Sequence, residues 1–244
     1  MPDSSAAEVR LVRHATLSIT VGETAFLVDP MLAAPGAIPP IPETPNDRDN
    51  PLVPLPDVDL SHDAVVVTHR HVDHFDEAAR EELDPAVPLF CQPAEADAFA
   101  ADGFTDVRPV DDAVSFRGVQ ISRTPGRHGH GELAEEMGPV SGFAFAGKET
   151  VYVAGDTVWY DGVAEALNRH RPDMVVLNGG AARFEYGEPI TMGVDDVAAV
   201  RDATDATVGV VHMEAINHCL LTRDELGRAV PEICVPADGE LVRD

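Results

Sequence analysis

The sequence AVVVTHRHVDH, residues 64–74, joins an apolar run to a histidine-rich motif. Its first half is a short run of apolar, mostly β-branched residues, which is typical of a buried strand. Its second half places His69, His71, Asp73 and His74 within six positions. Alternate residues of an extended chain point the same way, so His69 and His71 are able to converge on one metal ion. We therefore predict a buried strand that ends in a metal-binding motif, rather than a solvated strand end that is rich in histidine by chance.

The remaining candidate ligands lie at the ends of other predicted strands. Imidazole and carboxylate groups suit Zn²⁺, Mn²⁺ or Fe²⁺ better than Ca²⁺ or Mg²⁺. His128 follows a strand in RTPGRH, Asp156 ends the strand in VAGDT, and His212 ends the strand in VVHM. Taken alone, each is better explained as a core or surface histidine or as a turn aspartate. They become candidate ligands because the 69–74 motif needs partners on neighbouring strands.

The rest of the chain alternates between short strands and helices. Residues 9–20 and 23–30 flank Val21-Gly22 and indicate a hairpin. Residues 31–56 contain many prolines, which exclude helix and sheet interior, so we predict a lid or pocket wall in preference to a domain linker. Helices are expected over 75–83, 161–170 and 193–203, and a final one begins near Thr222 with a capping box. This pattern predicts one α/β domain over 1–244, with strands in two packed sheets.

The ordered set HxHxDH (69–74), His128, Gly155-Asp156 and His212 resembles the metallo-β-lactamase superfamily over nearly the whole chain. The stretches RHAT (13–16), NGGA (178–181) and HMEAINH (212–218) are most similar to its ascorbate-6-phosphate lactonase-like branch. The resemblance implies a four-layer αββα sandwich, with two mixed sheets and helices outside. It also implies that His69, His71 and His128 hold one metal ion and that Asp73, His74 and His212 hold another. Asp156 would bridge the two ions.

The resemblance further implies a hydrolase in which a hydroxide shared by two divalent metal ions attacks a carbonyl or phosphoryl centre. We expect Zn²⁺ foremost, with Mn²⁺ or Fe²⁺ as alternatives, and a lactone or similar ester as the small-molecule substrate. Asp73 and His218 are the predicted catalytic residues, the latter to orient the substrate or to donate a proton. His14 and His130 are weaker candidates for that role. Asp29 is a candidate partner for a ligand histidine, and Arg183 is a candidate contact for an anionic substrate.

Three other functions remain open at this point. A phosphodiesterase would use the same metal centre, although few cationic residues are available to bind its substrate. A redox di-iron protein of this fold usually has Glu at the position of His71, which argues against it. A non-catalytic, metal-dependent interaction module would bind metal without turnover.

Composition excludes several partners. The 244 residues carry a formal charge of −26, which disfavours binding to nucleic acids and to anionic membrane surfaces. No apolar run is long enough to span a bilayer, and the N-terminus does not resemble a signal peptide. The three widely separated cysteines predict a reducing, cytoplasmic location. A homo-oligomer remains open, and the acidity is explained equally by adaptation to salt or by a GC-rich genome.

Overall fold

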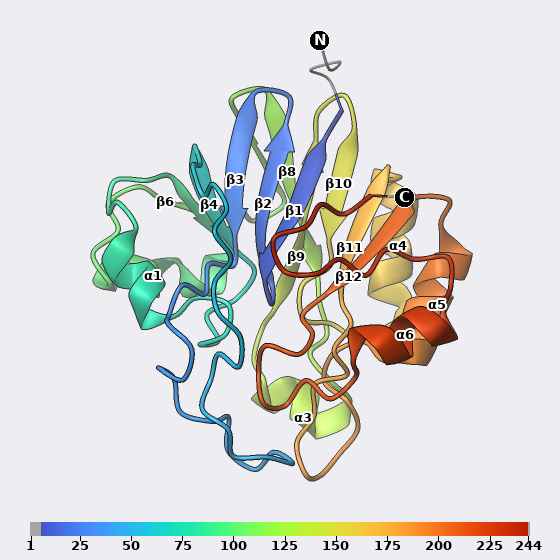
Figure 1. The fold of residues 1–244 in the computed structure, drawn as a ribbon. Helices are drawn as coiled ribbons and strands as arrows, with labels where there is room; N and C mark the ends of the chain where they lie inside the picture. Colours follow the sequence, from blue (N-terminus) through green and yellow to red (C-terminus); the bar gives the residue numbers. More distant parts are fainter. Residues whose placement is uncertain (1–5, 244) are drawn as a thin grey trace.

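Two six-stranded sheets face each other at the centre of the protein (Figure 1). The computed structural model describes residues 6–243. The first sheet has the strand order β1-β2-β3-β4-β5-β6, and the second has the order β12-β11-β10-β9-β8-β7. The strands of the first sheet are β1 Glu8–Arg13, β2 Thr16–Val21, β3 Thr24–Val28, β4 Ala64–Val67, β5 Leu89–Cys91 and β6 Val107–Pro109. Those of the second are β7 Ala113–Phe116, β8 Val119–Pro125, β9 Ser141–Ala146, β10 Thr150–Val153, β11 Met174–Asn178 and β12 Thr207–Val211.

Apolar packing divides the protein into four layers. The inward faces of both sheets share one core, in which Phe26, Phe143 and Phe145 are fully buried. The outward face of the first sheet packs against α1 (Glu77–Glu82) and α2 (Ala96–Ala101), and a 3₁₀ turn (Pro93–Glu95) directly precedes α2. The outward face of the second sheet packs against α4 (Asp161–His170), α5 (Val194–Ala203) and α6 (Arg223–Ala229). The predicted αββα sandwich with helices outside is confirmed.

Both sheets are mixed, and each contains parallel strands whose carboxyl ends lie at the same edge. Strands β3 to β6 pair in parallel, as do β10 to β12, while the other neighbours are antiparallel. The carboxyl ends of parallel strands lie at one edge of a sheet, where open α/β folds gather their ligand sites. Short helix α3 (Gly131–Glu136) and the loops of this edge lie together at the bottom of Figure 1.

The predicted hairpin over residues 9–30 is wrong in one respect. Residues 9–20 do not form one strand, because the chain turns at His14 and Ala15 and so separates β1 from β2. The two strands pair antiparallel, and β2 then pairs with β3 across the predicted turn at Gly22. His14 has φ +60°, a conformation that a simple alternation pattern does not reveal.

The proline-rich segment 31–56 contains no helix or strand, as predicted, but it is held in place at both ends. Arg13 is fully buried, and its Nη2 donates to the carbonyl oxygens of Met31 (2.6 Å) and Ala33 (3.0 Å). Its Nη1 donates to the carbonyl oxygen of Val53 at 3.2 Å. One guanidinium therefore ties the beginning of the segment to its end.

Within residues 6–243, no helix is long and apolar enough to cross a bilayer.

Candidate metal centre

The 69–74 motif leaves β4 and turns toward the space between the sheets. His69, Asp73 and His74 are buried, and His71 is half-buried. The backbone N–H groups of His74 and Phe75 both donate to the carbonyl oxygen of His71, which closes a turn before α1 begins. This turn brings the side chains of the motif close together: the ring of His69 is 4.4 Å from that of His71 and 4.1 Å from that of His74, centroid to centroid.

Asp29, at the end of β3, holds this motif from the neighbouring strand. Its Oδ1 accepts from the backbone N–H of Thr68 (2.7 Å), and its Oδ2 accepts from Thr68 Oγ1 (2.7 Å) and His74 Nδ1 (2.8 Å). Asp29 is buried and has φ +46°. The predicted contact between Asp29 and a ligand histidine is therefore present, and its Nδ1 bond leaves Nε2 of His74 free to face the site.

The second sheet supplies His128 after β8, Asp156 after β10 and His212 after β12. Gly155 precedes Asp156 with φ +68°, and a Cβ there would lie 2.7 Å from the carbonyl oxygen of Ser141, so no other residue fits without a shift. Asn178 Nδ2 donates to Asp156 Oδ1 at 2.6 Å. Loop residues that follow strands of both sheets thus meet at a single cluster.

Asp156 lies at the centre of this cluster. Its Oδ2 is 3.3 Å from the Nε2 atoms of both His74 and His128, and 3.9 Å from Nε2 of His69. Its Oδ1 is 3.4 Å from His212 Nε2. The same Nε2 atom of His69 lies 3.0 Å from His71 Nδ1. A single carboxylate therefore contacts histidines from both halves of the predicted ligand set.

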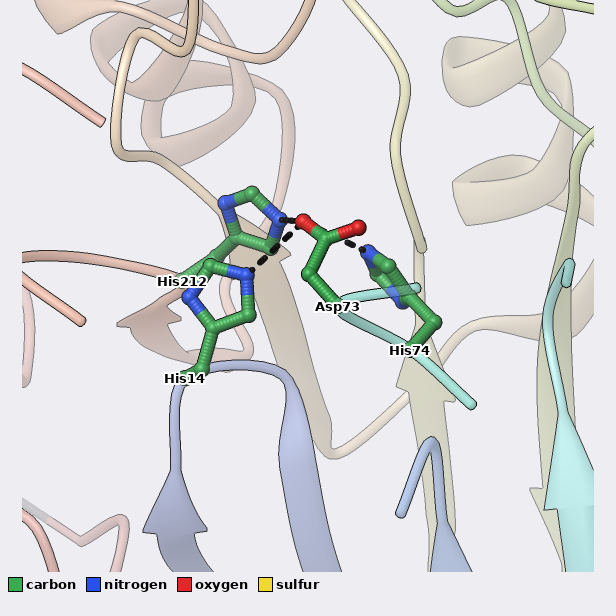
Figure 2. A group of neighbouring side chains, drawn as sticks. All are labelled: His14, Asp73, His74 and His212. Carbon is green, nitrogen blue, oxygen red and sulfur yellow. Dashed lines mark hydrogen bonds and ion pairs between the residues drawn. The ribbon is translucent and has the colours of Figure 1, made fainter. Parts of the chain in front are cut away.

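Asp73 forms the other half with His212 and with an unexpected partner, His14. Figure 2 shows Asp73 between these two imidazoles and His74. Asp73 Oδ2 lies 3.1 Å from His14 Nε2, 3.6 Å from His212 Nε2 and 4.0 Å from His74 Nε2. The rings of His14 and His212 are 3.8 Å apart between centroids. His14 is fully buried and does not line the cavity described below, so its predicted contact with substrate is replaced by a contact with Asp73.

The donor pattern of the cluster fits a bound cation. The Nδ1 atoms of His74 and His128 donate to Asp29 and to the carbonyl oxygen of Ile190 (2.8 Å), so their Nε2 atoms present lone pairs. These lone pairs face the carboxylate of Asp156, which also only accepts. Acceptors that face acceptors in a buried site need a cation between them. Imidazole and carboxylate groups are the ligands of Zn²⁺, Mn²⁺ and Fe²⁺, so this cluster is able to bind such a metal.

Electrostatics of the protein without metal lead to the same conclusion. Burial by itself would lower the pKa of His74, but the carboxylates of Asp156, Asp29 and Asp73 raise the pKa to about 10. A proton on this imidazole then takes the place of a cation. Burial likewise opposes ionisation of Asp156, yet the surrounding imidazoles hold its pKa well below the usual value. Asp156 is therefore a carboxylate at neutral pH.

A cavity of about 280 Å³ opens onto this cluster. His71, Asp73, His128 and Asp156 form its floor, and His218 reaches it from the loop after β12. The remaining lining is apolar and consists of Ile41, Pro42, Val72, Met137, Phe184 and Ile190. Ile41 and Pro42 belong to the proline-rich segment, so part of this segment lines the cavity. No lysine or arginine lies among the described lining residues, and Arg183 is exposed outside it.

His218 is buried in the wall of the cavity. Burial is the main cause that lowers its pKa to about 4, so the imidazole is neutral at pH 7. Its Nδ1 has no hydrogen-bond partner within residues 6–243. Cys219, next in sequence, places Sγ 3.5 Å from His212 Nδ1. The sequence suggests only a buried apolar role for this thiol, because the contact depends on how the loop after β12 folds.

Two facing mixed sheets with a His/Asp cluster at their shared edge define a class of metal-binding αββα proteins. The profile of the family described as "Beta-lactamase superfamily domain" matches residues 24–213. The UPF0173 protein YddR of Bacillus subtilis is 41% identical over 94% of this chain and 96% of its own length. The UPF0173 metal-dependent hydrolase Ta0764 of Thermoplasma acidophilum is 23% identical over 78% of this chain and 77% of its own.

Among solved structures, the isothiocyanate hydrolase from Delia radicum gut bacteria superposes with a TM-score of 0.91. It is 35% identical, and the match covers 98% of this chain and 99% of that one. The chain therefore belongs to the metallo-β-lactamase superfamily, and within it to the UPF0173 group. The similarity to the lactonase-like branch stays a prediction.

Proposed function

We propose that this protein is a metal-dependent hydrolase that adds water to the electrophilic carbon of a small, uncharged substrate, a lactone or similar ester. The observation that carries the proposal is the cavity above the His/Asp cluster, whose described lining is apolar apart from the cluster itself and His218. A cavity of this size accepts a small molecule. Its apolar wall suits an uncharged substrate that bears a compact apolar group.

In this proposal His69, His71 and His128 hold one divalent metal ion, and Asp73, His74 and His212 hold a second, with Asp156 shared between them. When bound, such ions supply Lewis acidity and lower the pKa of water to near neutrality. The geometry of the carboxylates supports this assignment, because Asp156 contacts histidines of both sets and Asp73 contacts only the second. Zn²⁺ is the ion we expect first.

His218 contributes through its neutral imidazole. With a pKa of about 4 it holds no spare proton at pH 7, so it is a poor general acid in the ground state. Its N–H group is still a hydrogen-bond donor at the wall of the cavity. We propose that His218 orients the substrate by a hydrogen bond to its carbonyl or leaving-group atom. We propose that Asp73, as a metal ligand on the cavity surface, positions the metal-bound reacting groups next to the substrate.

Isothiocyanates are a second candidate substrate class. The specific observation is the 35% identical structure titled an isothiocyanate hydrolase, which matches nearly the whole of both chains. An isothiocyanate is also an uncharged carbon electrophile with an apolar substituent. Addition of one water to its central carbon, followed by cleavage of the carbon–nitrogen bond, yields an amine and carbonyl sulfide. Lactones and isothiocyanates therefore both need an uncharged, apolar cavity next to the metal cluster.

A phosphodiesterase is the weaker alternative. A phosphodiester carries a negative charge that proteins commonly bind with arginine or lysine, and the described lining has neither. The chain as a whole is also strongly acidic.

A substrate panel tests the proposal. Protein reconstituted with Zn²⁺ or Mn²⁺ is assayed with lactones, with isothiocyanates and with phosphodiesters of similar size, with Asp156→Ala as the inactive control. We expect turnover of a lactone or an isothiocyanate at a kcat/KM at least about 100-fold above that of any phosphodiester. A preference for phosphodiesters would overturn the proposed substrate class, and bound metal without any turnover would favour the interaction module.

A further inference from the structure

Asn217, next to the cavity residue His218, forms several hydrogen bonds with the proline-rich segment. It is buried, and its Oδ1 accepts from the backbone N–H of Ile41 (3.0 Å) and from Asn50 Nδ2 (3.0 Å). Its Nδ2 lies 2.6 Å from Thr44 Oγ1 and 2.7 Å from the carbonyl oxygen of Asn46. Every one of these partners belongs to the proline-rich segment.

The backbone of Asn217 extends this network. Its N–H donates to Asn50 Oδ1 at 2.9 Å, and its carbonyl oxygen accepts from Asn46 Nδ2 at 2.6 Å. An asparagine that uses its backbone and both ends of its side chain on one neighbouring segment fixes the position of that segment closely. The contact lies at the middle of the segment, whereas Arg13 binds its two ends.

The next residue, His218, connects the same point to the opposite wall. Its carbonyl oxygen accepts from the backbone N–H of Arg183 at 3.1 Å, next to the cavity residue Phe184. The two walls also touch directly, because the N–H of Glu185 donates to the carbonyl oxygen of Glu43 at 2.7 Å. The dipeptide 217–218 therefore joins both apolar walls of the cavity and also presents the imidazole of His218 to it.

We infer that Asn217 is a positioning residue that sets the width of the substrate cavity, by fixing Ile41 and Pro42 relative to His218. The expected effect on catalysis rests on the proposed function. The hydrogen-bonded link between Asn217 and the proline-rich segment does not depend on that function. Asn217 does not line the cavity, so it acts through these neighbours and not by touching substrate. Its loss is expected to relax selection for the size of the apolar group while the metal ligands stay in place.

The test compares Asn217→Ala with the wild type and with Asn168→Ala, an asparagine on the exposed face of α4. Thr44→Val is a second variant in case Asn217→Ala does not fold. It removes one side-chain partner of Asn217, together with the bonds that Thr44 Oγ1 donates to the carbonyl oxygens of Ile41 and Asn46. Three quantities are measured on metal-reconstituted protein. They are the metal content, amide hydrogen exchange over residues 38–50, and kcat and KM for a series of substrates with apolar groups of increasing size.

For Asn217→Ala we expect unchanged metal content and amide exchange at least about tenfold faster over residues 38–50, since buried hydrogen bonds are lost there. We expect KM for the preferred substrate to rise about tenfold with a smaller change in kcat, and the dependence on substrate size to flatten. Thr44→Val should shift the same quantities less, and Asn168→Ala should match the wild type.

Exchange and size selectivity like those of Asn168→Ala would overturn the inference. Loss of metal from Asn217→Ala would also overturn it, because the residue would then support the metal cluster rather than the cavity wall. If wild-type protein turned over no substrate of either class, the proposed function would fall. The exchange measurement would still decide whether Asn217 holds the segment.

Discussion

Replacement of Asp29 by asparagine isolates the partner of one ligand histidine. Asp29 accepts three hydrogen bonds, two from Thr68 and one from His74 Nδ1. Asparagine has nearly the same shape and tolerates the positive φ of this position, so the backbone is preserved. If its oxygen keeps the bond to the N–H of Thr68, its amide group faces Nδ1 of His74. Two donors then face each other.

His74 relieves this conflict by moving its proton to Nε2, the nitrogen that faces Asp156. A protonated Nε2 cannot bind a metal ion, so the substitution acts directly on the proposed second metal site. Loss of a partner behind a ligand histidine costs 10- to 100-fold in metal affinity, which is about 1.4–2.7 kcal/mol. The burial of both groups and the forced change of tautomer favour the upper end, about 100-fold.

Stepwise Zn²⁺ affinities from competition with a chelator measure this effect. We expect the Asp29→Asn variant to lose affinity at the site of Asp73, His74 and His212, and to keep affinity within a few-fold at the other. The matched control is Asp59→Asn, an exposed aspartate that accepts hydrogen bonds from the backbone N–H and the hydroxyl of Ser61. Two unchanged affinities in a well-folded Asp29→Asn protein would refute the reasoning.

Four further outcomes follow from the site, the cavity wall and the surface charge. In the proposed centre Asp156 is shared, so Asp156→Ala should lose both metal ions, whereas His128→Ala should weaken mainly one site; metal analysis after dialysis distinguishes the two variants, and equal losses would contradict the assignment. Burial lowers the pKa of His218 from 6.5 to about 4, so the unfolded chain binds the extra proton between these values and stability falls as the pH falls through this window. From pH 7.5 to pH 5 the free energy of unfolding, measured by denaturant titration, should therefore fall by about 2 kcal/mol less in His218→Phe than in the wild type. An equal fall in both proteins would contradict the lowered pKa of His218. Shortening of Ile38–Asp47 by a Gly/Ser bridge should raise KM or change substrate preference with metal content intact, and unchanged kinetics over the panel would make this part a passive loop. If the acidity is an adaptation to salt, the melting temperature should rise up to molar salt because screening relieves repulsion; a flat response would favour genome composition.

The sequence predicts the parts of the fold that depend on local pattern. Apolar β-branched runs such as residues 64–67 identify buried strands, and the capping box at Thr222 and Glu225 is present where α6 begins. The break between β1 and β2 is missed because residues 9–20 alternate without a glycine or proline at the turn. The two-residue loop between the paired residues Arg13 and Thr16 requires the left-handed conformation of His14. The partners of its side chain, Asp73 and His212, lie far away in sequence.

For the candidate site, the sequence predicts which side chains gather but not the side chains that support them. The seven predicted ligands gather because each follows a strand whose end lies at the shared edge. The side chains that support them, such as Asn178 and Cys219, are not predictable, since their partners are 22 and 7 residues away and depend on loop conformation. The same holds for Asn217, whose partners lie at least 167 residues away.

Metal titration of the chelator-treated protein measures whether catalysis requires two bound ions. Substrate turnover and bound metal are recorded together as Zn²⁺ is added to protein at known concentration. The proposed centre predicts that turnover is absent without metal, that it rises with added Zn²⁺, and that it reaches its plateau near two bound ions per chain. Full turnover in the metal-free protein, or a plateau with no metal bound, would contradict it.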